Sequence, residues 1–486
     1  MRTLLLCGLL AVATLQAGAI WAGEAPDSGA RPGTDTSGPG TQAARLPDTA
    51  AGKLVADYLV AFNSDDEDAL RIYLEANLSP EAVAQRPVEG RLQALRQIRA
   101  DAGKLELERV TEAREDGLTV VARGTTGKWL EISFVFEPDA PHRFVGARFE
   151  LLDGPPGAET VGESITESEL VAELAGYLDS LVAHDEFSGV VVLAGSEVPV
   201  FRKAYGLASK EYRVPNRLET RFNLGSINKF FTNIAVEQLV GAGALNLDDT
   251  IGKYLPDYPN EEAAAKVTVR HLVDMTSGIG DFFGEKYWNT PKGRIRDLVD
   301  YLPLFASEPL EFAPGTNNRY SNGGYVVLGL IVEKASGKSY FDYVREHICE
   351  PAGMRSTGHF EADVPVPDVA SGYTLIWDGE EHPGEPRRNN MYTRPARGSS
   401  AGGGYSTADD LLKLVAALKA GKLSAPGVSR AVAESGVGIA GGAPGISAYV
   451  GILPETGHTI VVLSNYDPPS ALTVGREMTR MTKRLK

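Results

Sequence analysis

The spacing of the apolar residues changes once in the first third of the chain, and this change limits the fold of that region more than any other feature. In KLVADYLVAF, residues 53–62, the large apolar side chains recur at helical spacing and form one stripe, which comprises Leu54, Val55, Tyr58, Leu59 and Phe62. A second helix is predicted behind the cap-like Asn63 and Ser64, and a third amphipathic run covers about residues 80–102. The region therefore begins with helices.

The apolar residues then alternate with a period of two. Alternation is clear in GLTVVARG (117–124), KWLEISFVFE (128–137) and HRFVGARFELLD (142–153). In the middle segment one face is apolar throughout and is formed by Leu130, Ile132, Phe134 and Phe136. Helices followed by a strand meander predict a small α+β domain over residues 47–153, with the helices on one side of a curved sheet.

The order of these elements resembles the cone-shaped nuclear-transport-factor-like (SnoaL-like) fold. In relatives of that fold the cone either holds a pocket or serves as a scaffold. The segment contains no carboxylate–histidine pair that would demand catalysis. The resemblance therefore implies a scaffold or a ligand-binding cone ahead of an enzyme.

The start of the chain has the pattern of a secretory signal peptide. Residues 1–22, MRTLLLCGLLAVATLQAGAIWA, consist of an early basic residue, an apolar run and small residues, and cleavage is expected after Ala19 or Ala22. A retained membrane anchor is the alternative, because the apolar run is just long enough to be considered. Residues 23–46 are rich in Gly, Pro, Ser and Thr and predict a disordered linker. A periplasmic or secreted protein is expected, without stable membrane insertion after cleavage.

Charge and cysteine content exclude several classes of partner and cofactor. The formal net charge of -16 over 486 residues argues against nucleic acid and anionic membranes, since both favour basic patches. Once Cys7 is removed with the leader, Cys349 is the only thiol, so no intramolecular disulfide is expected. The seven histidines show no paired spacing and no cysteine cluster exists, so no metal or other cofactor is expected. His271 is interpreted as a helix-packing histidine.

The rest of the chain is predicted to form one large domain, residues 166–486, behind a Gly- and Pro-rich linker at 154–165. FSGVVVLAG (187–195) and VPVFRKAYG (198–206) predict paired strands near its start. HTIVVLSNY, near the C-terminus, predicts a buried strand, and mostly helices and long loops are expected in between.

The helix predicted in RFNLGSINKFFTNIAVEQLV (221–240) carries Ser226 and Lys229 three residues apart, and therefore on one face. A first turn more often carries an acid, because the helix N-terminus has partial positive charge. A serine becomes a nucleophile when a neighbouring base takes its proton, and Lys229 can do so if burial keeps its amine near neutral. The alternative is a helix cap followed by a solvated lysine.

A second candidate group is Tyr320-Ser321-Asn322, which follows a Pro-Gly turn and precedes a Gly-Gly pair and an apolar helix. A tyrosine at such a turn can act as a general base when cations lower its pKa. The same Y-x-N tripeptide occurs at Tyr258 and Tyr287, which are interpreted as surface tyrosines because their surroundings are polar.

Residues 166–486 resemble the β-lactamase-related serine hydrolases, which include class C β-lactamases, D-alanyl-D-alanine carboxypeptidases and penicillin-recognising esterases. The resemblance rests on segments in order along the chain: FSGVVVL, AYGLAS, RFNLGSINKFFT, LNLDDTIGKYLPDYP, VTVRHLVDMTSGI, PGTNNRYSNGGYVVLG, PAGMRSTGHF, SSAGGGYSTADDLLKL and GGAPG…VVLSNYD. It implies an α/β (α+β) fold with an antiparallel sheet flanked by helices. It also implies that Ser226 is the nucleophile, that Lys229 and Tyr320 shuttle its proton, and that Asn322 contacts substrate or orders the lysine.

The third motif of the family, K-T-G or H-x-G, is altered in this chain. Aligning GGAPG places Ile439 where Lys or His is expected and Gly441 at the motif glycine, with a backbone N–H of Gly441 or Gly442 available for the oxyanion. His382 and Lys419 also begin short H-x-G and K-x-G matches, but neither just precedes the final strands. Only fourteen residues separate Leu423 from Gly438, which predicts a shortened strand ahead of the motif.

These residues predict a secreted serine hydrolase that cleaves an ester or amide, including D-amino-acid peptides, through an acyl-enzyme on Ser226. The altered third motif predicts weakened activity. The rival interpretation is a catalytically impaired relative that binds peptidoglycan fragments or a protein partner.

Overall fold

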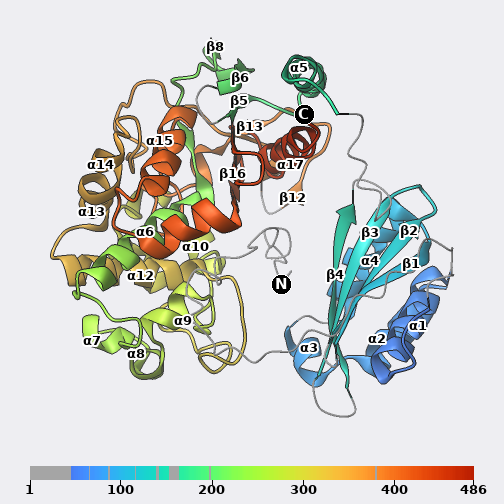
Figure 1. The fold of residues 1–486 in the computed structure, drawn as a ribbon. Coiled ribbons are helices and arrows are strands. Elements are labelled where there is room, and N and C mark those ends of the chain that lie inside the picture. The colour runs from blue at the N-terminus through green and yellow to red at the C-terminus, as the bar shows by residue number, and fades with distance from the viewer. Residues whose placement is uncertain are drawn as a thin grey trace. The chain divides into compact units, whose positions relative to one another are not determined.

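The computed structural model describes residues 45–485, apart from 65, 86–87, 115–116, 138–141, 153–163, 196–198 and 378–379. The predicted signal peptide and most of the two predicted linkers lie outside the described residues. The chain divides into two compact units, a smaller one within residues 27–163 and a larger one that comprises residues 164–486. Figure 1 shows both units.

The smaller unit consists of helices followed by a four-stranded antiparallel sheet of order β1-β2-β3-β4. Its elements are α1 (Ala50–Asn63), α2 (Glu67–Asn77), α3 (Pro80–Gln85), α4 (Val88–Ala102), β1 (Leu105–Ala113), β2 (Gly117–Gly124), β3 (Trp129–Phe136) and β4 (Phe144–Leu152). The α+β prediction for this region is confirmed. Its identity as a SnoaL-like cone stays a prediction.

An aromatic cluster joins the helices of the smaller unit to its sheet. The ring of Tyr58 on α1 lies 5.2 Å from that of Phe134 on β3 and 5.7 Å from that of Phe144 on β4. Tyr58 belongs to the predicted helical stripe and Phe134 to the predicted apolar strand face, and both are buried. The two periodicities thus meet in one core.

Two details of the predicted helices are wrong. The N-cap of α2 is Asp66, whose carboxylate accepts the N–H of Asp68 at 3.0 Å, whereas Ser64 is the C-cap of α1. The run over 80–102 contains two helices, α3 and α4, and the sequence between them includes Pro87, which has no N–H to donate inside a helix.

The larger unit is built on a five-stranded antiparallel sheet of order β15-β16-β17-β5-β6. These strands are β5 (Gly189–Ala194), β6 (Pro199–Tyr205), β15 (Val437–Ala443), β16 (Ile446–Leu453) and β17 (His458–Ser464). Because β17 pairs with β5, the last strand of the chain lies beside the first strand of the unit. The predicted strand pair near the start and the buried strand near the end are confirmed.

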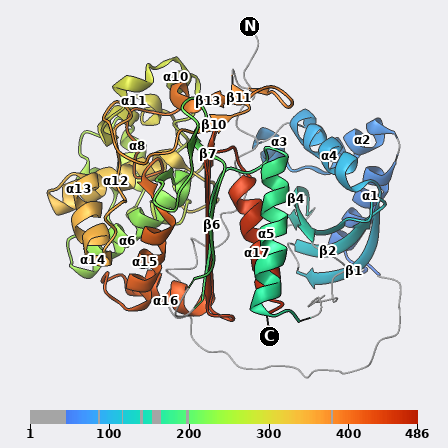
Figure 2. The ribbon, with the colours of Figure 1, turned by 90° about the horizontal axis from the view of Figure 1, so that it is seen from above.

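Helices cover both faces of this sheet, as Figure 2 shows with the sheet seen edge-on. One face is covered by α5 (Glu167–Ala183) and α17 (Ser470–Thr482), which share a core with the strands. The other face meets a larger helical layer with its own core. The predicted antiparallel sheet flanked by helices is therefore confirmed.

The helical layer is centred on two buried helices, α6 (Asn228–Gly241) and α12 (Asn322–Ser336). α12 is apolar on most sides and must therefore be enclosed, whereas α6 also buries polar residues such as Lys229 and Glu237. Its other helices are α7 (Ile251–Tyr254), α8 (Glu261–Lys266), α9 (Val269–Val273), α10 (Glu285–Asn289), α11 (Leu302–Phe305), α13 (Tyr340–Val344), α14 (Glu350–Ala352), α15 (Ala408–Lys419) and α16 (Pro426–Arg430).

The remaining strands are short and form two-stranded pairs outside the main sheet. They are β7 (Leu207–Ser209), β8 (Val214–Pro215), β9 (Phe222–Asn223), β10 (Tyr373–Thr374), β11 (Ile376–Trp377), β12 (Glu380–Glu381), β13 (Arg388–Asn389) and β14 (Tyr405–Ser406). Ahead of β15, residues 426–435 form α16 and a π-helical turn, so the shortened strand predicted there is replaced by helix.

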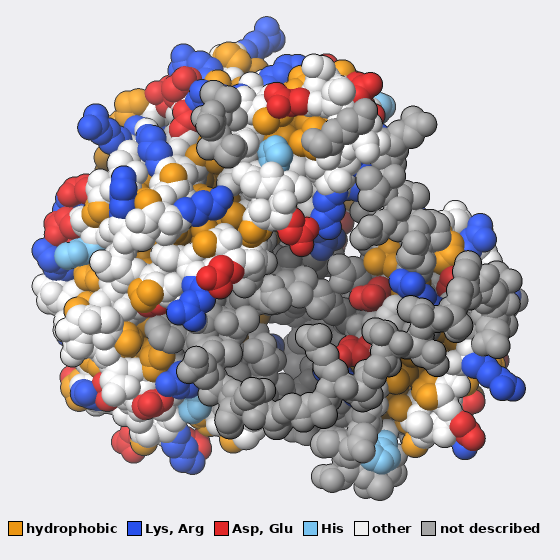
Figure 3. All heavy atoms as spheres, in the orientation of Figure 1, with side chains coloured by type: hydrophobic (Ala, Val, Ile, Leu, Met, Phe, Trp, Pro, Cys, Tyr) orange, Lys and Arg blue, Asp and Glu red, His pale blue; other side chains and the backbone are white. Residues whose placement is uncertain are grey.

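Acidic and basic side chains are interspersed on the face of the larger unit that Figure 3 shows. None of the helices in the described part of the chain is long and apolar enough to cross a membrane.

Candidate active site

Ser226 and Lys229 lie at the junction of a 3-10 turn, Gly225–Ile227, with α6. The predicted helix is therefore present, although Ser226 belongs to its tighter first turn. Gly225 has a positive φ of 50°, and a Cβ there would lie 2.6 Å from the backbone nitrogen of Gly442. Glycine thus lets the Ser226 turn approach the edge strand β15.

The side-chain nitrogen of Lys229 is enclosed by three oxygen atoms. Its Nζ lies 2.7 Å from Asn322 Oδ1, 2.6 Å from the carbonyl of Ala401 and 3.2 Å from Ser226 Oγ. The side chain is only 7% exposed, which excludes the solvated lysine considered from the sequence.

The protonation state of Lys229 follows from this enclosure. Burial lowers the pKa of Lys229 to about 7, although the nearby carboxylate of Asp281 raises it in part. A neutral amine has two N–H groups and one lone pair. The carbonyls of Asn322 and Ala401 can only accept, so they take the two N–H groups and leave the lone pair for the hydroxyl of Ser226.

The Ala401 carbonyl is fixed from two sides. Ser400 Oγ donates to the carbonyl of Tyr325 on α12 at 2.7 Å, and Thr232 Oγ1 on α6 donates to the carbonyl of Ser400 at 2.7 Å. The backbone at Ser400 and Ala401 is thus held between the two central helices, α6 and α12, and the Ala401 carbonyl is brought to Lys229 as an acceptor.

Tyr320 lies on the other side of the serine, with its Oη 2.6 Å from Ser226 Oγ. Burial raises the pKa of Tyr320, and the hydrogen bond between its hydroxyl and that of Ser226 offsets part of that rise. The expectation that cations lower this pKa is therefore wrong, because burial outweighs the effect of the amine beside the ring, Lys229, whose own pKa of about 7 leaves it only partly charged near pH 7. Tyr320 therefore carries its proton near neutral pH.

Asn322 is the first residue of α12, directly behind its N-cap Ser321. Its Oδ1 faces Lys229, and its Nδ2 donates to Asp281 Oδ2 at 2.6 Å. The structure therefore brings together Ser226, Lys229, Tyr320 and Asn322, and it adds Asp281.

The strand β15 passes directly beside the serine turn. A Cβ on Gly441 would lie 2.0 Å from the carbonyl oxygen of Leu224 and 2.8 Å from the backbone nitrogen of Ser226, so only glycine fits. N–H groups alternate in direction along an antiparallel strand. Counted from the turn between β15 and β16, the N–H of Gly441 points to β16 and that of Gly442 points to the edge that faces Ser226.

Of the two predicted oxyanion glycines, Gly441 thus allows the close approach and Gly442 offers the outward N–H. Ile439 lies two residues before Gly441 and shares its strand face. Its half-buried side chain packs against the same core as Tyr320. An apolar group therefore occupies this position beside the site.

Other residues considered from the sequence lie in structural roles. His382 stacks on Trp377 with 4.0 Å between the ring centroids, and Lys419 ends α15. Tyr258 and Tyr287 are buried, so their interpretation as surface tyrosines is wrong; Tyr287 packs among aromatic rings that its polar sequence neighbours do not reveal.

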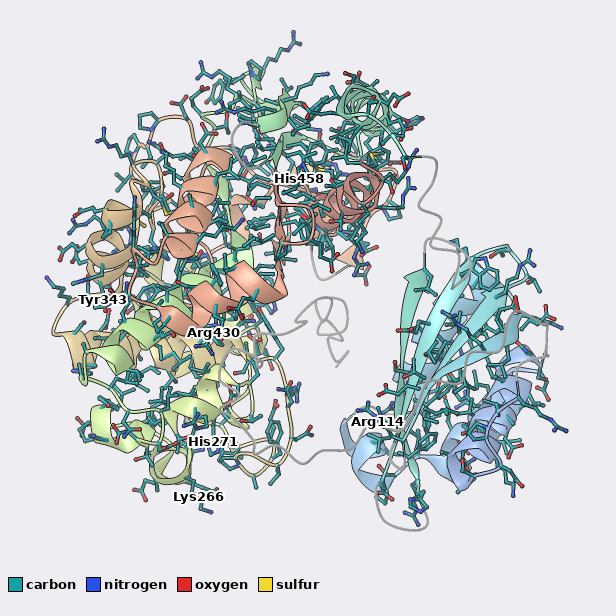
Figure 4. The ribbon with its side chains drawn as sticks, in the orientation of Figure 1. Arg114, Lys266, His271, Tyr343, Arg430 and His458 are labelled. Atoms are coloured by element: carbon teal, nitrogen blue, oxygen red, sulfur yellow. The ribbon has the colours of Figure 1, made fainter. Side chains whose placement is uncertain are left out.

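His271 lies on α9, whose N-terminus it caps by accepting the N–H of Thr268 at Nδ1. Figure 4 labels it among the short helices, near Lys266 at the end of α8. This capping role agrees with the interpretation of His271 as a helix-packing histidine. In the described part of the chain no group of three or more His, Cys, Asp and Glu side chains is placed to hold a metal ion.

Asp281 and Ala401 are the site residues that sequence reasoning missed. Asp281 lies two positions after the TSGI segment and carries no motif of its own. Ala401 acts through a backbone carbonyl, which no side-chain pattern records.

Sequence and structure comparisons identify relatives of this chain. A family model described as Beta-lactamase matches residues 174–480. Esterase EstB of Burkholderia gladioli is 31% identical over 283 residues, which cover 53% of this chain and 72% of the esterase. Penicillin-binding protein 4* of Bacillus subtilis is 33% identical over 181 residues, which cover 37% of this chain and only 39% of that protein.

A solved structure shows the same fold. The crystal structure of a penicillin binding protein from Bacillus halodurans matches with a TM-score of 0.56 at 31% identity, and the match covers 62% of this chain and 98% of that one.

Proposed function

This chain belongs to the β-lactamase family of serine hydrolases, and we propose that it cleaves an ester or amide bond through an acyl-enzyme on Ser226. One observation carries the proposal. The Ser226 hydroxyl lies between a buried amine at 3.2 Å and a phenol at 2.6 Å, and the other two neighbours of that amine are carbonyl acceptors.

The neutral amine of Lys229 is the base in the first step. It takes the Ser226 proton as Oγ attacks the substrate carbonyl carbon. The charge that develops on the carbonyl oxygen is stabilised by the backbone N–H groups of Ser226 and Gly442. As the tetrahedral intermediate collapses, the bond to the leaving group breaks and Tyr320 passes a proton to it, while Lys229 holds the proton taken from the serine.

Water then attacks the acyl-enzyme. Where the leaving group has taken its proton from Tyr320, the same groups act in reverse order: the phenolate of Tyr320 takes a proton from the water, and protonated Lys229 returns its proton to Ser226 Oγ. Both residues regain their resting states, and the carboxylic acid is released.

The substrate class is inferred from the relatives and from Ile439. An esterase and penicillin-binding proteins are among the relatives, so esters and D-amino-acid peptides are both candidates. Isoleucine has no charge and no hydrogen-bond donor, so it cannot attract a substrate carboxylate. Small neutral esters are therefore the preferred substrates that we propose, and a periplasmic or secreted location follows from the predicted leader.

A second candidate function rests on the same isoleucine. If the cation normally expected there is needed for turnover, the chain would bind peptidoglycan fragments or a protein partner without cleaving them. The enclosed, neutral lysine favours the hydrolase, because a binding protein gains nothing from a buried amine whose charged form is destabilised.

A covalent probe separates the two functions. Wild type and Ser226→Ala are incubated with a fluorophosphonate, and intact mass and peptide mapping locate the label. Ser307→Ala, which changes an exposed serine and leaves Ser226, Lys229 and Tyr320 intact, is the control. We expect labelling of wild type and of the control at Ser226, and none of Ser226→Ala. Equal labelling of all three proteins, or of none, would contradict the hydrolase.

A further inference from the structure

Asp281 lies in the loop between α9 and α10, and its carboxylate is held by N–H donors from two segments. Oδ2 accepts Asn322 Nδ2 at 2.6 Å and, more weakly, the Asn322 backbone N–H at 3.4 Å. Oδ1 accepts the backbone N–H of Phe283 at 3.0 Å. Both oxygens are thus engaged, and one of them meets a residue that touches Lys229.

The chemistry of this contact fixes the orientation of the Asn322 amide. A carboxamide has a donor end and an acceptor end of nearly equal size, so either could face Lys229. An ionised carboxylate only accepts, and it therefore requires the NH2 end of Asn322. The carbonyl end must then face Lys229, as observed at 2.7 Å.

This orientation determines where the lone pair of Lys229 points. With the Asn322 carbonyl and the Ala401 carbonyl as acceptors, both N–H groups of the neutral amine are used and the lone pair is left for Ser226. If the Asn322 amide turned over, its NH2 would face the amine. The lone pair would then accept from Asn322, and an N–H would point at the serine instead.

We propose that Asp281 is a positioning residue that locks the Asn322 amide, so that the lone pair of Lys229 faces the Ser226 hydroxyl. The inference rests on the proposed function, in which Lys229 is the base. It adds to the site a positioning residue that lies 41 positions before Asn322 in the sequence.

The charge of Asp281 has a second, opposing effect. It raises the pKa of Lys229, which burial lowers. The other ionisable groups that face Lys229, Asp281 or their neighbours are three side chains and one ion pair: Tyr320, Tyr325, Asp274 and Glu311–Arg319. Orientation and charge can be separated by two substitutions, because an amide at position 281 keeps an acceptor and loses the charge.

The test compares Asp281→Asn and Asp281→Ala with wild type, using kcat/KM for a neutral p-nitrophenyl ester from pH 5 to 9. In Asp281→Asn the new amide can turn its carbonyl to Asn322 and gives up the hydrogen bond from the Phe283 N–H, so activity is retained within a few-fold and the acidic limb moves to lower pH. In Asp281→Ala the lock is lost, and we expect a fall of roughly 10²-fold, as for a misplaced catalytic group. Glu311→Gln removes a neighbouring charge that makes no contact with Asn322 and serves as the control.

Each outcome has one meaning. Wild-type activity and an unmoved pH limb in Asp281→Ala would overturn the proposal. An equal loss in both variants with the limb unmoved would also overturn it, since that result marks a purely structural role. Asp281→Asn is nearly isosteric and keeps the experiment decisive if the alanine variant fails to fold. A wild type that neither turns over the ester nor takes the fluorophosphonate would instead contradict the proposed function.

Discussion

The protonation of Lys229 offers the sharpest test of the proposed mechanism. The ordinary pKa of a lysine, 10.5, falls to about 7 in this site because the amine is buried. This lowering of the pKa disfavours the charged form of Lys229 by about 5 kcal/mol. Near pH 7 about half of the Lys229 amines are neutral, compared with about one in 3,000 for a lysine in water.

This value determines how the acylation rate depends on pH. A base works only when it is unprotonated, so the rate is lost as the pH falls through the pKa of Lys229. We expect the rate constant for acylation by a neutral p-nitrophenyl ester to fall about tenfold per unit below pH 7 and to level off above it. The burst of released nitrophenol, followed in stopped-flow experiments from pH 5 to 9 at the wavelength where nitrophenol and nitrophenolate absorb equally, measures this rate constant, and the ester itself does not titrate.

Lys229→Arg provides the matching perturbation. The guanidinium has no lone pair at any accessible pH, so the acylation rate of the variant should be about 10²–10⁴-fold lower. Its pH profile should also lack the acidic limb near pH 7. Lys338→Arg replaces a lysine in an exposed ion pair with Glu346, and it should change neither the acylation rate nor the acidic limb of the pH profile. A flat profile in wild type from pH 5 to 9, or an arginine variant within a few-fold of wild type, would refute Lys229 as the base.

Three further predictions concern the third-motif strand and the domain boundary. Wild type should have a higher kcat/KM for a neutral ester than for a peptide with a free C-terminal carboxylate. Ile439→His should raise turnover and shift the alkaline side of its pH profile. A wild-type preference for the peptide would contradict this placement of Ile439. Gly441→Ala would put a Cβ 2.0 Å from the Leu224 carbonyl oxygen and should reduce the acylation rate by roughly 10²-fold. Gly438→Ala, on the same strand but with no neighbour closer than 3.6 Å to the added Cβ, should leave the rate unchanged. Similar acylation rates in the two variants would exclude a role for the close approach of Gly441. Residues 164–486 contain their own cores and should fold alone with a cooperative thermal transition, and aggregation of this fragment alone would contradict independent folding.

The sequence predicts those parts of the site that short spacing controls. Ser226 and Lys229 are three residues apart on a helix, and helix geometry alone places them on one face. Tyr320 lies 94 residues further on and could be paired with them only through the family resemblance. The same logic holds for the fold, since periodicity predicts the elements but leaves exact boundaries, such as the cap of α2, to local side-chain contacts.

Asp281 and Ala401 could not be predicted because their roles arise from tertiary contacts. Asp281 acts on Lys229 through Asn322, and an isolated Asp after a turn carries no signal of such a partner. Ala401 contributes only its backbone carbonyl, whose direction is fixed by hydrogen bonds of Ser400 and Thr232. Burial is equally hidden, and it is the burial of Lys229 that makes the amine a base.

The altered third motif affects the steps of the mechanism unequally. The oxyanion donors are backbone N–H groups, and they depend on the close passage of Gly441 past Leu224 and not on the side chain at 439. Lys229 also needs no second cation, since burial alone brings its pKa to about 7. The step that the altered motif weakens is protonation of the leaving group, because the raised pKa of Tyr320 makes its phenol a weak acid. Nitrophenolate leaves without a proton, whereas an amine cannot. Isoleucine at position 439 should therefore narrow the range of leaving groups towards activated esters, without abolishing formation of the acyl-enzyme.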